Sequence, residues 1–287
     1  YKFFFEEDTK LQSAWSYWEV SGAKKIIGAA VKGSDLYVLT EYDEDGTSSQ
    51  SGTYLEKVSL RPEQVDPGTE IEILLDRKIT ESEVTSTSLN NAGALGVETV
   101  ITLPYPINTG ADMIVVGRFE EGNTLLRHGQ VIEPLSQTSN TITVLGDLKT
   151  QVGGKTPRFF IGERYTMTYE FSTPYIKEQP QGGGVALAAG PKLQMRTWTV
   201  IFDESSAFEL KVTPASRDTN TYPYNGVIVG EAPPLIGDPS VLTGSFRVPV
   251  MTSNIDTKIV ISSTSPLPCR FQSAEWEGFY HTRAKRK

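Results

Sequence analysis

Short runs in which apolar and polar residues alternate recur through the chain, and turn-forming residues separate them. Alternation with a period of two places the apolar side chains on one face of a β-strand. The chain contains 30 Thr, 22 Val and 18 Ile residues, whose β-branched side chains lose rotamer freedom in a helix and fit a pleated sheet. No segment long enough to form a helix has its apolar residues at helical spacing. The sequence therefore predicts an all-β fold.

The first sixty residues predict five short strands joined by polar turns. Strands at such regular spacing are typical of a barrel, a sandwich or a propeller. Five strands with exposed edges should not stand alone, and Tyr1 is followed at once by an apolar run. We therefore expect that this sequence begins inside a folded element and that packing partners precede it. The predicted strands cover residues 1–5, 14–20, 25–31, 36–42 and 53–60.

Beyond residue 60, two turn-rich stretches divide the chain. Residues 61–68 contain two prolines and a glycine, which predicts a boundary, and residues 153–157 predict a weaker one. We expect residues 193–202 and 207–213 to pair as a hairpin, and the glycine-rich stretch 179–190 to be a mobile loop. The other strands predicted here are 70–75, 98–103, 113–119, 141–145, 158–162, 165–171, 245–251, 257–262 and 269–278.

The charge and cysteine content exclude several classes of protein. The 27 Lys and Arg against 35 Asp and Glu give a net charge of −8, which argues against a nucleic-acid clamp. A negative surface would instead let nucleic acid pass without binding it. We find neither a secretory signal nor an apolar run near the roughly 20 residues that span a bilayer. The single Cys269 excludes an intramolecular disulfide framework and a cysteine-rich metal site.

Residues 153–156, Gly-Gly-Lys-Thr, resemble the end of a phosphate-binding loop. The full pattern needs a glycine where Lys149 stands, and a helix after the threonine to aim its amides at phosphate. Here Pro157 and a predicted strand follow instead. We interpret the stretch as a turn between strands.

Glu41, Asp43, Asp45 and Gly46 occupy the first, third, fifth and sixth places of a calcium-binding loop. The twelfth place should supply a bidentate carboxylate, but it is Gly52, and no helices are predicted beside the loop. We interpret it as a solvated turn.

The chain has two histidines, His128 in an Arg-His-Gly turn and His281 in a basic C-terminal run. A Ser-His-Asp site needs an imidazole held by a carboxylate within reach of a hydroxyl, and neither position predicts that. Two histidines and one cysteine also supply few ligands for a metal. We therefore predict no catalytic, cofactor-binding or metal-binding residues.

Paired carboxylates leave one enzymatic alternative open, because a glycosidase needs only two of them across a cleft. Glu275 and Glu277 alternate with Trp276, so both should lie on one face of a strand. They could act as acid and nucleophile if a substrate groove ran past them, but we favour Trp276 as a core anchor between solvated carboxylates. Three further pairs lie in predicted turns: Asp43 with Asp45, Glu120 with Glu121, and Asp203 with Glu204.

Two aromatic sets allow three interpretations: a sugar-stacking platform, a core, or an interface with a neighbouring subunit. Large aromatic side chains in β-rich proteins are usually core, and Trp and Tyr are also enriched at interfaces. We favour the core over the interface. The sets are Trp15, Tyr17 and Trp18, and Trp276, Phe279 and Tyr280.

At these stretches the chain resembles the tail nozzle proteins of short-tailed, podovirus-type bacteriophages, often called tail tubular protein B. The resemblance covers nearly the whole chain, is loose between residues 68 and 157, and corresponds to the C-terminal portion of much longer proteins. Its motifs include Tyr-Lys-Phe at the start and Trp-Glu-Gly-Phe-Tyr near the end. The four ordered blocks that carry it are residues 1–20, 160–177, 192–212 and 246–280.

This resemblance implies that residues 1–64 form the last strands of an incomplete β-propeller. Residues 65–287 would form a β-sandwich-like nozzle module with a further division near 157. It also implies a structural protein of the virion tail, assembled in the host cytoplasm, with no enzymatic activity and no cofactor. The expected partners are other copies in a hexameric ring, a portal-adaptor ring protein, a tail fibre protein and double-stranded DNA, which passes during ejection without specific binding.

Two alternatives to the structural role remain open at this point. The first is a β-sandwich module that binds or hydrolyses polysaccharide. The second is an adhesin-like domain, which would share the composition but not the four ordered blocks.

Overall fold

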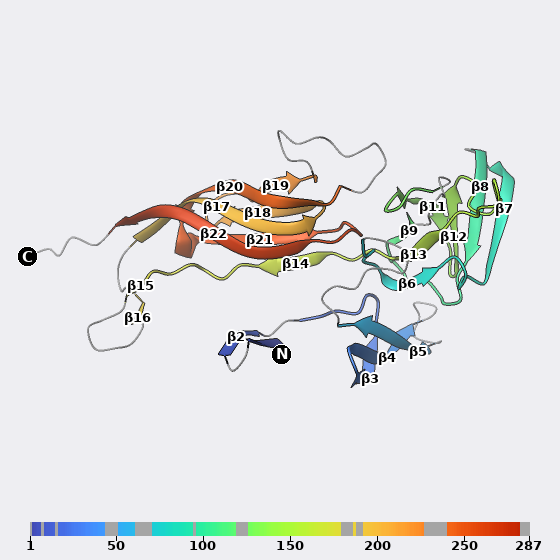
Figure 1. Cartoon of the computed structure of the whole chain (residues 1–287), viewed down its shortest axis with the longest axis horizontal. Helices are drawn as coiled ribbons and strands as arrows, with labels where there is room; N and C mark the ends of the chain where they lie inside the picture. The colour runs from blue at the N-terminus through green and yellow to red at the C-terminus, as the bar shows by residue number, and fades with distance from the viewer. Residues whose placement is uncertain are drawn as a thin grey trace, which may run out of the picture. The chain divides into compact units, whose positions relative to one another are not determined.

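The computed structural model describes residues 2–6, 9–14, 17–43, 51–60, 71–93, 96–118, 126–178, 186–187, 192–226 and 240–281. The regular structure in these ranges is antiparallel β-sheet apart from one 3₁₀ turn (Figure 1), which confirms the all-β prediction. None of the described sheets is closed. The chain divides into two compact units, Tyr1–Arg61 with Pro106–Ala111, and Pro62–Tyr105 with Asp112–Lys287.

The first unit contains a two-stranded and a three-stranded sheet. The prediction of a strand over residues 14–20 is wrong, because the strand ends at Ala14 and residues 17–20 join no ladder. The polar residues before Ala14 pair instead with the first strand. The two sheets are β1 (Lys2–Glu6) with β2 (Thr9–Ala14), and β3 (Lys25–Lys32), β4 (Asp35–Asp43) and β5 (Ser51–Ser59) in that order.

The second unit begins with two four-stranded sheets. The strand expected over residues 70–75 is wrong, because residues 71–75 pair with no strand and β6 begins at Asp76. Ile73 and Leu75 are buried, so the alternation of apolar residues here marks the buried side of an extended segment and not pairing with another strand. One sheet has the order β10 (Val131–Ile132), β9 (Met113–Gly117), β13 (Phe159–Glu163), β6 (Asp76–Thr80), and the other β11 (Pro134–Gln137), β12 (Thr141–Leu145), β8 (Gly96–Thr102), β7 (Ser86–Gly93).

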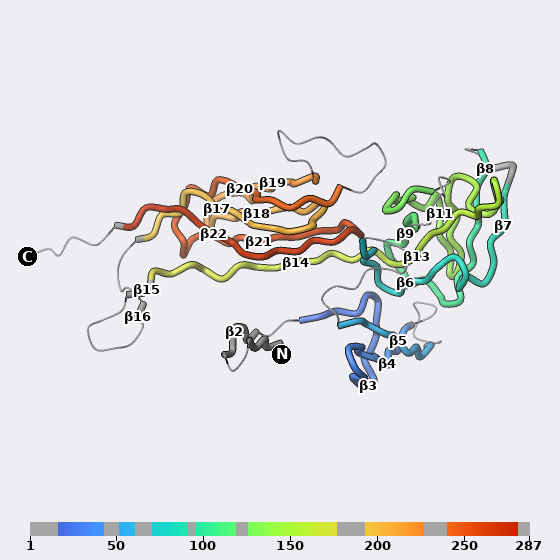
Figure 2. The backbone as a smooth tube through the Cα atoms, in the orientation of Figure 1, coloured from blue at the N-terminus to red at the C-terminus, as the bar shows by residue number. Residues whose placement is uncertain are grey.

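Two further sheets and a short strand pair complete the second unit. The long strands β17, β20 and β22 run alongside one another (Figure 2). The mobile loop predicted at 179–190 lies outside the described residues except for β16. The sheets are β14 (Met167–Glu170), β21 (Thr257–Ser263), β18 (Phe208–Pro214), β19 (Asn220–Tyr224), and β20 (Leu242–Ser253), β17 (Lys192–Ser205), β22 (Arg270–His281); the pair is β15 (Lys177–Glu178) with β16 (Ala186–Leu187), and the 3₁₀ turn η1 is Asn254–Asp256.

The prediction that residues 193–202 and 207–213 form a hairpin is wrong. β17 pairs with β20 and β22, whereas β18 pairs with β19 and β21 in the other sheet. The chain crosses between the sheets at Ser205 and Ser206, which are both buried. Both strands point their apolar residues at one core, so alternation alone could not distinguish a hairpin from two strands that face each other.

Aromatic side chains fill the core between these two sheets. The ring of Phe208 on β18 lies 5.3 Å from Phe202, 4.8 Å from Tyr224, 5.8 Å from Phe246 and 5.1 Å from Phe271, measured between centroids. These residues come from strands of both sheets; Phe202, Phe208 and Tyr224 belong to one buried cluster, and Phe246 and Phe271 are partly buried and pack against it. The two sheets therefore pack face to face on an aromatic core, with their other faces turned outward.

Candidate functional surfaces

The outer face of β22 carries the carboxylates that sequence analysis singled out. Glu275 lies opposite Thr199 and Glu277 opposite Thr197 on β17, and both carboxylates are exposed. Trp276 lies opposite Trp198 and packs against the buried core. The two glutamates therefore share one solvent face around a core anchor, as predicted.

Glu277 belongs to a small polar network on this face. Its Oε2 accepts hydrogen bonds from the Arg247 guanidinium on β20 and, over 3.3 Å, from the hydroxyl of Thr197. Both charged side chains are more than half exposed, so the pair contributes at most about 1 kcal/mol. Two carboxylates on one strand at a sheet surface do not face each other across a substrate, which is what a glycosidase requires.

Asp203 and Glu204 hold the end of β17, just before the chain crosses to the other sheet, to the neighbouring strands β20 and β22. Thr243 donates to the Asp203 carboxylate and accepts a bond of 3.1 Å from the Glu204 amide. Arg270 pairs with the Glu204 carboxylate, and the Arg270 amide donates to the Ser205 hydroxyl over 2.7 Å. Glu204 has a left-handed backbone with φ of 40°. This acidic pair thus has a structural task, which sequence reasoning missed because the contacts come from distant strands.

Of the two remaining carboxylate pairs, the structure describes one residue. Asp43 ends β4, and Asp45, Glu120 and Glu121 lie outside the described residues.

The two histidines and the cysteine come from three separate segments of the chain. His128 is half-buried beside a turn in which the Gln130 amide donates to the Arg127 carbonyl over 3.1 Å. His281 ends β22. Burial raises the pKa of the Cys269 thiol, whose Sγ lies 3.5 Å from the Ala207 carbonyl, and a buried thiol of raised pKa is unreactive. Among the residues that the structure describes, no three His, Cys, Asp or Glu side chains are grouped to hold a metal ion.

The Gly-Gly-Lys-Thr stretch is a tight turn. Val152 and Lys155 exchange backbone hydrogen bonds of 2.9 and 3.0 Å, and Gly153 and Gly154 have φ of 60° and 80°. Positive φ at both central residues is the geometry in which glycine is favoured. No helix follows, because Pro157 leads into β13, so these amides do not form the helix start that holds phosphate.

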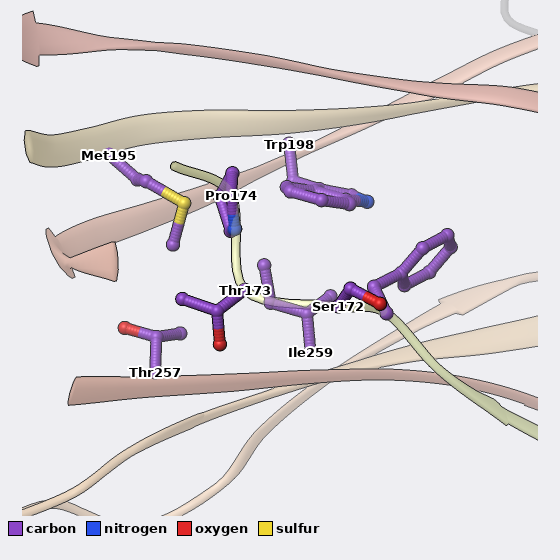
Figure 3. Close-up of a pocket in the computed structure, with 8 residues that line it drawn as sticks. Ser172, Thr173, Pro174, Met195, Trp198, Thr257 and Ile259 are labelled. Carbon is purple, nitrogen blue, oxygen red and sulfur yellow. The ribbon is translucent and has the colours of Figure 1, made fainter. Parts of the chain in front are cut away.

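A hollow of about 180 Å³, part of which is open solvent, lies at the edge of the aromatic core. Figure 3 shows Met195 and Trp198 of β17 on one side, Thr257 and Ile259 of β21 on the other, and residues 172–174 between them. Sites for small-molecule ligands usually measure 300–1,000 Å³. The hollow is smaller than that, and its lining contains no acid, base or histidine: Phe171, Ser172, Thr173, Pro174, Met195, Trp198, Thr257 and Ile259.

The first unit exposes apolar side chains on its sheet. Every residue of β3 is exposed, and its Ile26, Ile27 and Val31 are joined by Leu55 and Val58 of β5. Apolar side chains left exposed on a sheet are candidates for contact with another surface. This sheet is therefore a candidate contact surface.

The aromatic sets divide between core and surface. Tyr17 and Trp18 are 84% and 60% exposed, so the preferred core assignment is wrong for them within this chain and the interface interpretation remains. Trp276 packs against the core, whereas Phe279 and Tyr280 are exposed. Trp15 lies outside the described residues.

Comparisons with known proteins agree with the resemblance carried by the four sequence blocks. The sequence profile described as "Bacteriophage nozzle protein" matches residues 1–287. Tail tubular protein gp12 of Escherichia phage T7 is 23% identical over 288 residues, which cover 99% of this chain and 34% of that protein. The chain thus spans about a third of the length of this relative. Because the profile matches the whole chain, the chain belongs to the bacteriophage nozzle protein family.

Proposed function

We propose that this chain is a structural component of a bacteriophage tail, without enzymatic activity, which forms part of the nozzle wall that conducts DNA during ejection. The family match over all 287 residues carries this proposal. The structure supports it because the described acidic pairs either lie on an open sheet face or fasten the fold. The polysaccharide-hydrolysing alternative gains no support from that arrangement.

For the domains, we propose that residues 1–64 are the last strands of a β-propeller and that residues 65–287 are a β-sandwich-like nozzle module, divided again near 157. The support for the first part is the three-stranded sheet whose β3 is exposed along its whole length. In a propeller, neighbouring blades cover the faces of each such sheet. The support for the second part is the pair of sheets packed on an aromatic core.

For the partners, we propose other copies of the protein in a hexameric ring, a portal-adaptor ring protein and a tail fibre protein. A closed ring brings two different patches of each subunit together, and exposed Tyr17, Trp18 and Phe279 are side chains of the kind enriched at such contacts. The net charge of −8 suits a wall past which DNA slides, since phosphate is repelled. The location would be the virion tail, after assembly in the host cytoplasm.

Electron microscopy of purified virions labelled with an antibody against this chain tests the proposal. We expect label at the distal tail in end-on and side views, and its loss when the antibody is first absorbed with the purified chain. Label confined to the capsid shell or to the fibres would refute the proposed position.

A further inference from the structure

Two carboxyl groups face each other across the ladder between β6 and β13. Glu163 is the register partner of Asp76, and an irregularity in the pairing lies between Ile161 and Glu163. Arg77, beside this irregularity, has φ of 50°. A bulge in a ladder redirects the side chains next to it. Directly opposed residues in an antiparallel pair have Cβ atoms about 4.5–5.5 Å apart, and like charges there repel.

Glu163 is the buried member of the pair. It is 8% exposed on a strand that is buried along its whole length. Its Oε2 is buried and makes no hydrogen bond to the residues that the structure describes. A buried ionised carboxylate without a partner is strongly unfavourable, and such a group takes up a proton instead.

The charged groups around Glu163 do not remove this cost. The Arg77 guanidinium on β6 lies 4.1 Å from the ring centroid of Tyr105. Arg164, the next residue on the chain, pairs with Asp112 over 3.3 Å and with Glu133. On β9 the register partner of Glu163 is the uncharged Met113.

The balance of these groups favours the protonated form. Burial raises the pKa of Glu163, the carboxylates of Asp76 and Asp112 raise it further, and Arg77 opposes the change. Tyr165, two residues along, also has its pKa raised, to about 12, by burial first and by nearby carboxylates next. Both groups therefore resist a further negative charge at this place.

We propose that Glu163, opposite Asp76 on the β6–β13 ladder, keeps a proton that an exposed glutamate would lose, and that this proton makes the contact between this sheet and the pair of sheets with the aromatic core sensitive to pH. Glu163 lies close to the segments that connect these sheets. Glu163 ends β13, and the chain continues within a few residues into β14 of the second pair of sheets. Directly before β6, the Leu74 amide donates to the Pro266 carbonyl over 2.7 Å, and Leu267 packs on the core that contains Ile73.

The direction of the pH dependence follows from linkage. A carboxyl whose pKa is higher in the folded than in the unfolded state binds more protons when folded, so its contribution to stability falls as pH rises. That contribution is complete below the ordinary pKa of a glutamate. It is lost as the pH rises through the pKa of Glu163 in the folded protein.

Thermal unfolding between about pH 4 and 8, around the ordinary range of carboxyl groups, tests the proposal with three variants. Glu163→Gln keeps the shape and removes the titration, so its Tm should fall less with rising pH than that of the wild type. Asp76→Asn removes the facing charge and should move the wild-type fall to lower pH and make it smaller, because a neutral amide no longer repels the ionised form of Glu163. Glu275→Gln, on an exposed face of β22, is the matched control and should keep the wild-type dependence.

Infrared spectroscopy gives a second and independent readout. As the pH rises past the range in which exposed glutamates ionise, the wild type should keep the carbonyl band of a protonated carboxyl group longer than Glu163→Gln does. A wild-type band that disappears together with that of the variant, or Glu163→Gln with an unchanged pH dependence of Tm, would overturn the proposal. The spectrum keeps the test valid even if the glutamine variant is less stable than the wild type.

Discussion

Truncating Phe208 should show how far the aromatic core holds together the two sheets that pack on it. Phe208 is 2% exposed, and its ring contacts Phe202, Tyr224, Phe246 and Phe271 at centroid distances of 4.8–5.8 Å. Replacing a buried phenylalanine by alanine typically costs about 3–5 kcal/mol, because transfer free energy is lost and a cavity remains. Four ring neighbours leave little room for collapse, so we expect Phe208→Ala to lower the free energy of unfolding by about 4 kcal/mol.

Urea unfolding followed by tryptophan fluorescence measures this loss, because Trp198 and Trp276 belong to or pack on the same cluster. The expected result is a lower midpoint with an unchanged slope m, since the surface exposed on unfolding stays the same. Phe279→Ala is the matched control, because Phe279 is 57% exposed and its loss should change stability by no more than about 0.5 kcal/mol. A change below about 1 kcal/mol for Phe208→Ala would refute the conclusion that these rings join the sheets.

Three further substitutions test other parts of the structure. An added Cβ at Gly278 would lie 2.5 Å from a backbone carbonyl oxygen of β17. Gly278→Ala should therefore destabilise the protein by about 1–3 kcal/mol in the same urea assay. The control is Gly28→Ala, which should cost no stability because the added Cβ would meet nothing within 4 Å. The buried Thr99 hydroxyl donates to one backbone carbonyl over 2.6 Å and accepts from an amide over 2.9 Å. Thr99→Val should therefore lower the free energy of unfolding by about 1–3 kcal/mol. Thr102→Val, on the other face of β8, is the control and should change it little. Glu277→Gln removes an exposed ion pair, so it should lower the free energy of unfolding by less than about 1 kcal/mol, and by less again at high salt. In an assay for release of sugar from capsule and peptidoglycan, neither the wild type nor the variant should show turnover. Cleavage by the wild type that is lost in the variant would contradict the structural role.

The strands that sequence analysis predicted correctly share one property, which is that their alternation coincides with a backbone ladder. Residues 141–145 are predicted and observed with the same bounds, and their buried positions Ile142 and Val144 alternate as expected. Residues 70–75 show the limit of this signal, because Ile73 is buried without strand pairing. Alternation reports which side of an extended segment is buried, and the hydrogen-bond partner depends on residues far away in the sequence.

Polar strands and strand partners could not be predicted for the same reason. β7 has the sequence STSLNNAG, in which no apolar alternation marks a strand; its pairing with β8 supplies the structure. The polar residues Asp203 and Glu204 predict a hairpin turn, although the chain crosses to the other sheet after Ser205. Only the contacts of Thr243 and Arg270 show that these acids hold the end of β17 to its neighbours β20 and β22.

The surface features were predictable where they depended on local geometry. The common face of Glu275 and Glu277 follows from their spacing on a strand and is observed. The exposure of Trp18 could not be read from the sequence, since an aromatic side chain looks the same whether its own chain or a partner covers it.

The placement of β17 has a mechanical consequence. This 14-residue strand lies between two 12-residue strands and pairs with both along most of its length. A pull along its axis loads the ladder bonds on both sides in shear, so they must break together and cannot open one at a time from an end. A strand held on both sides in this way can bear tension along its own length.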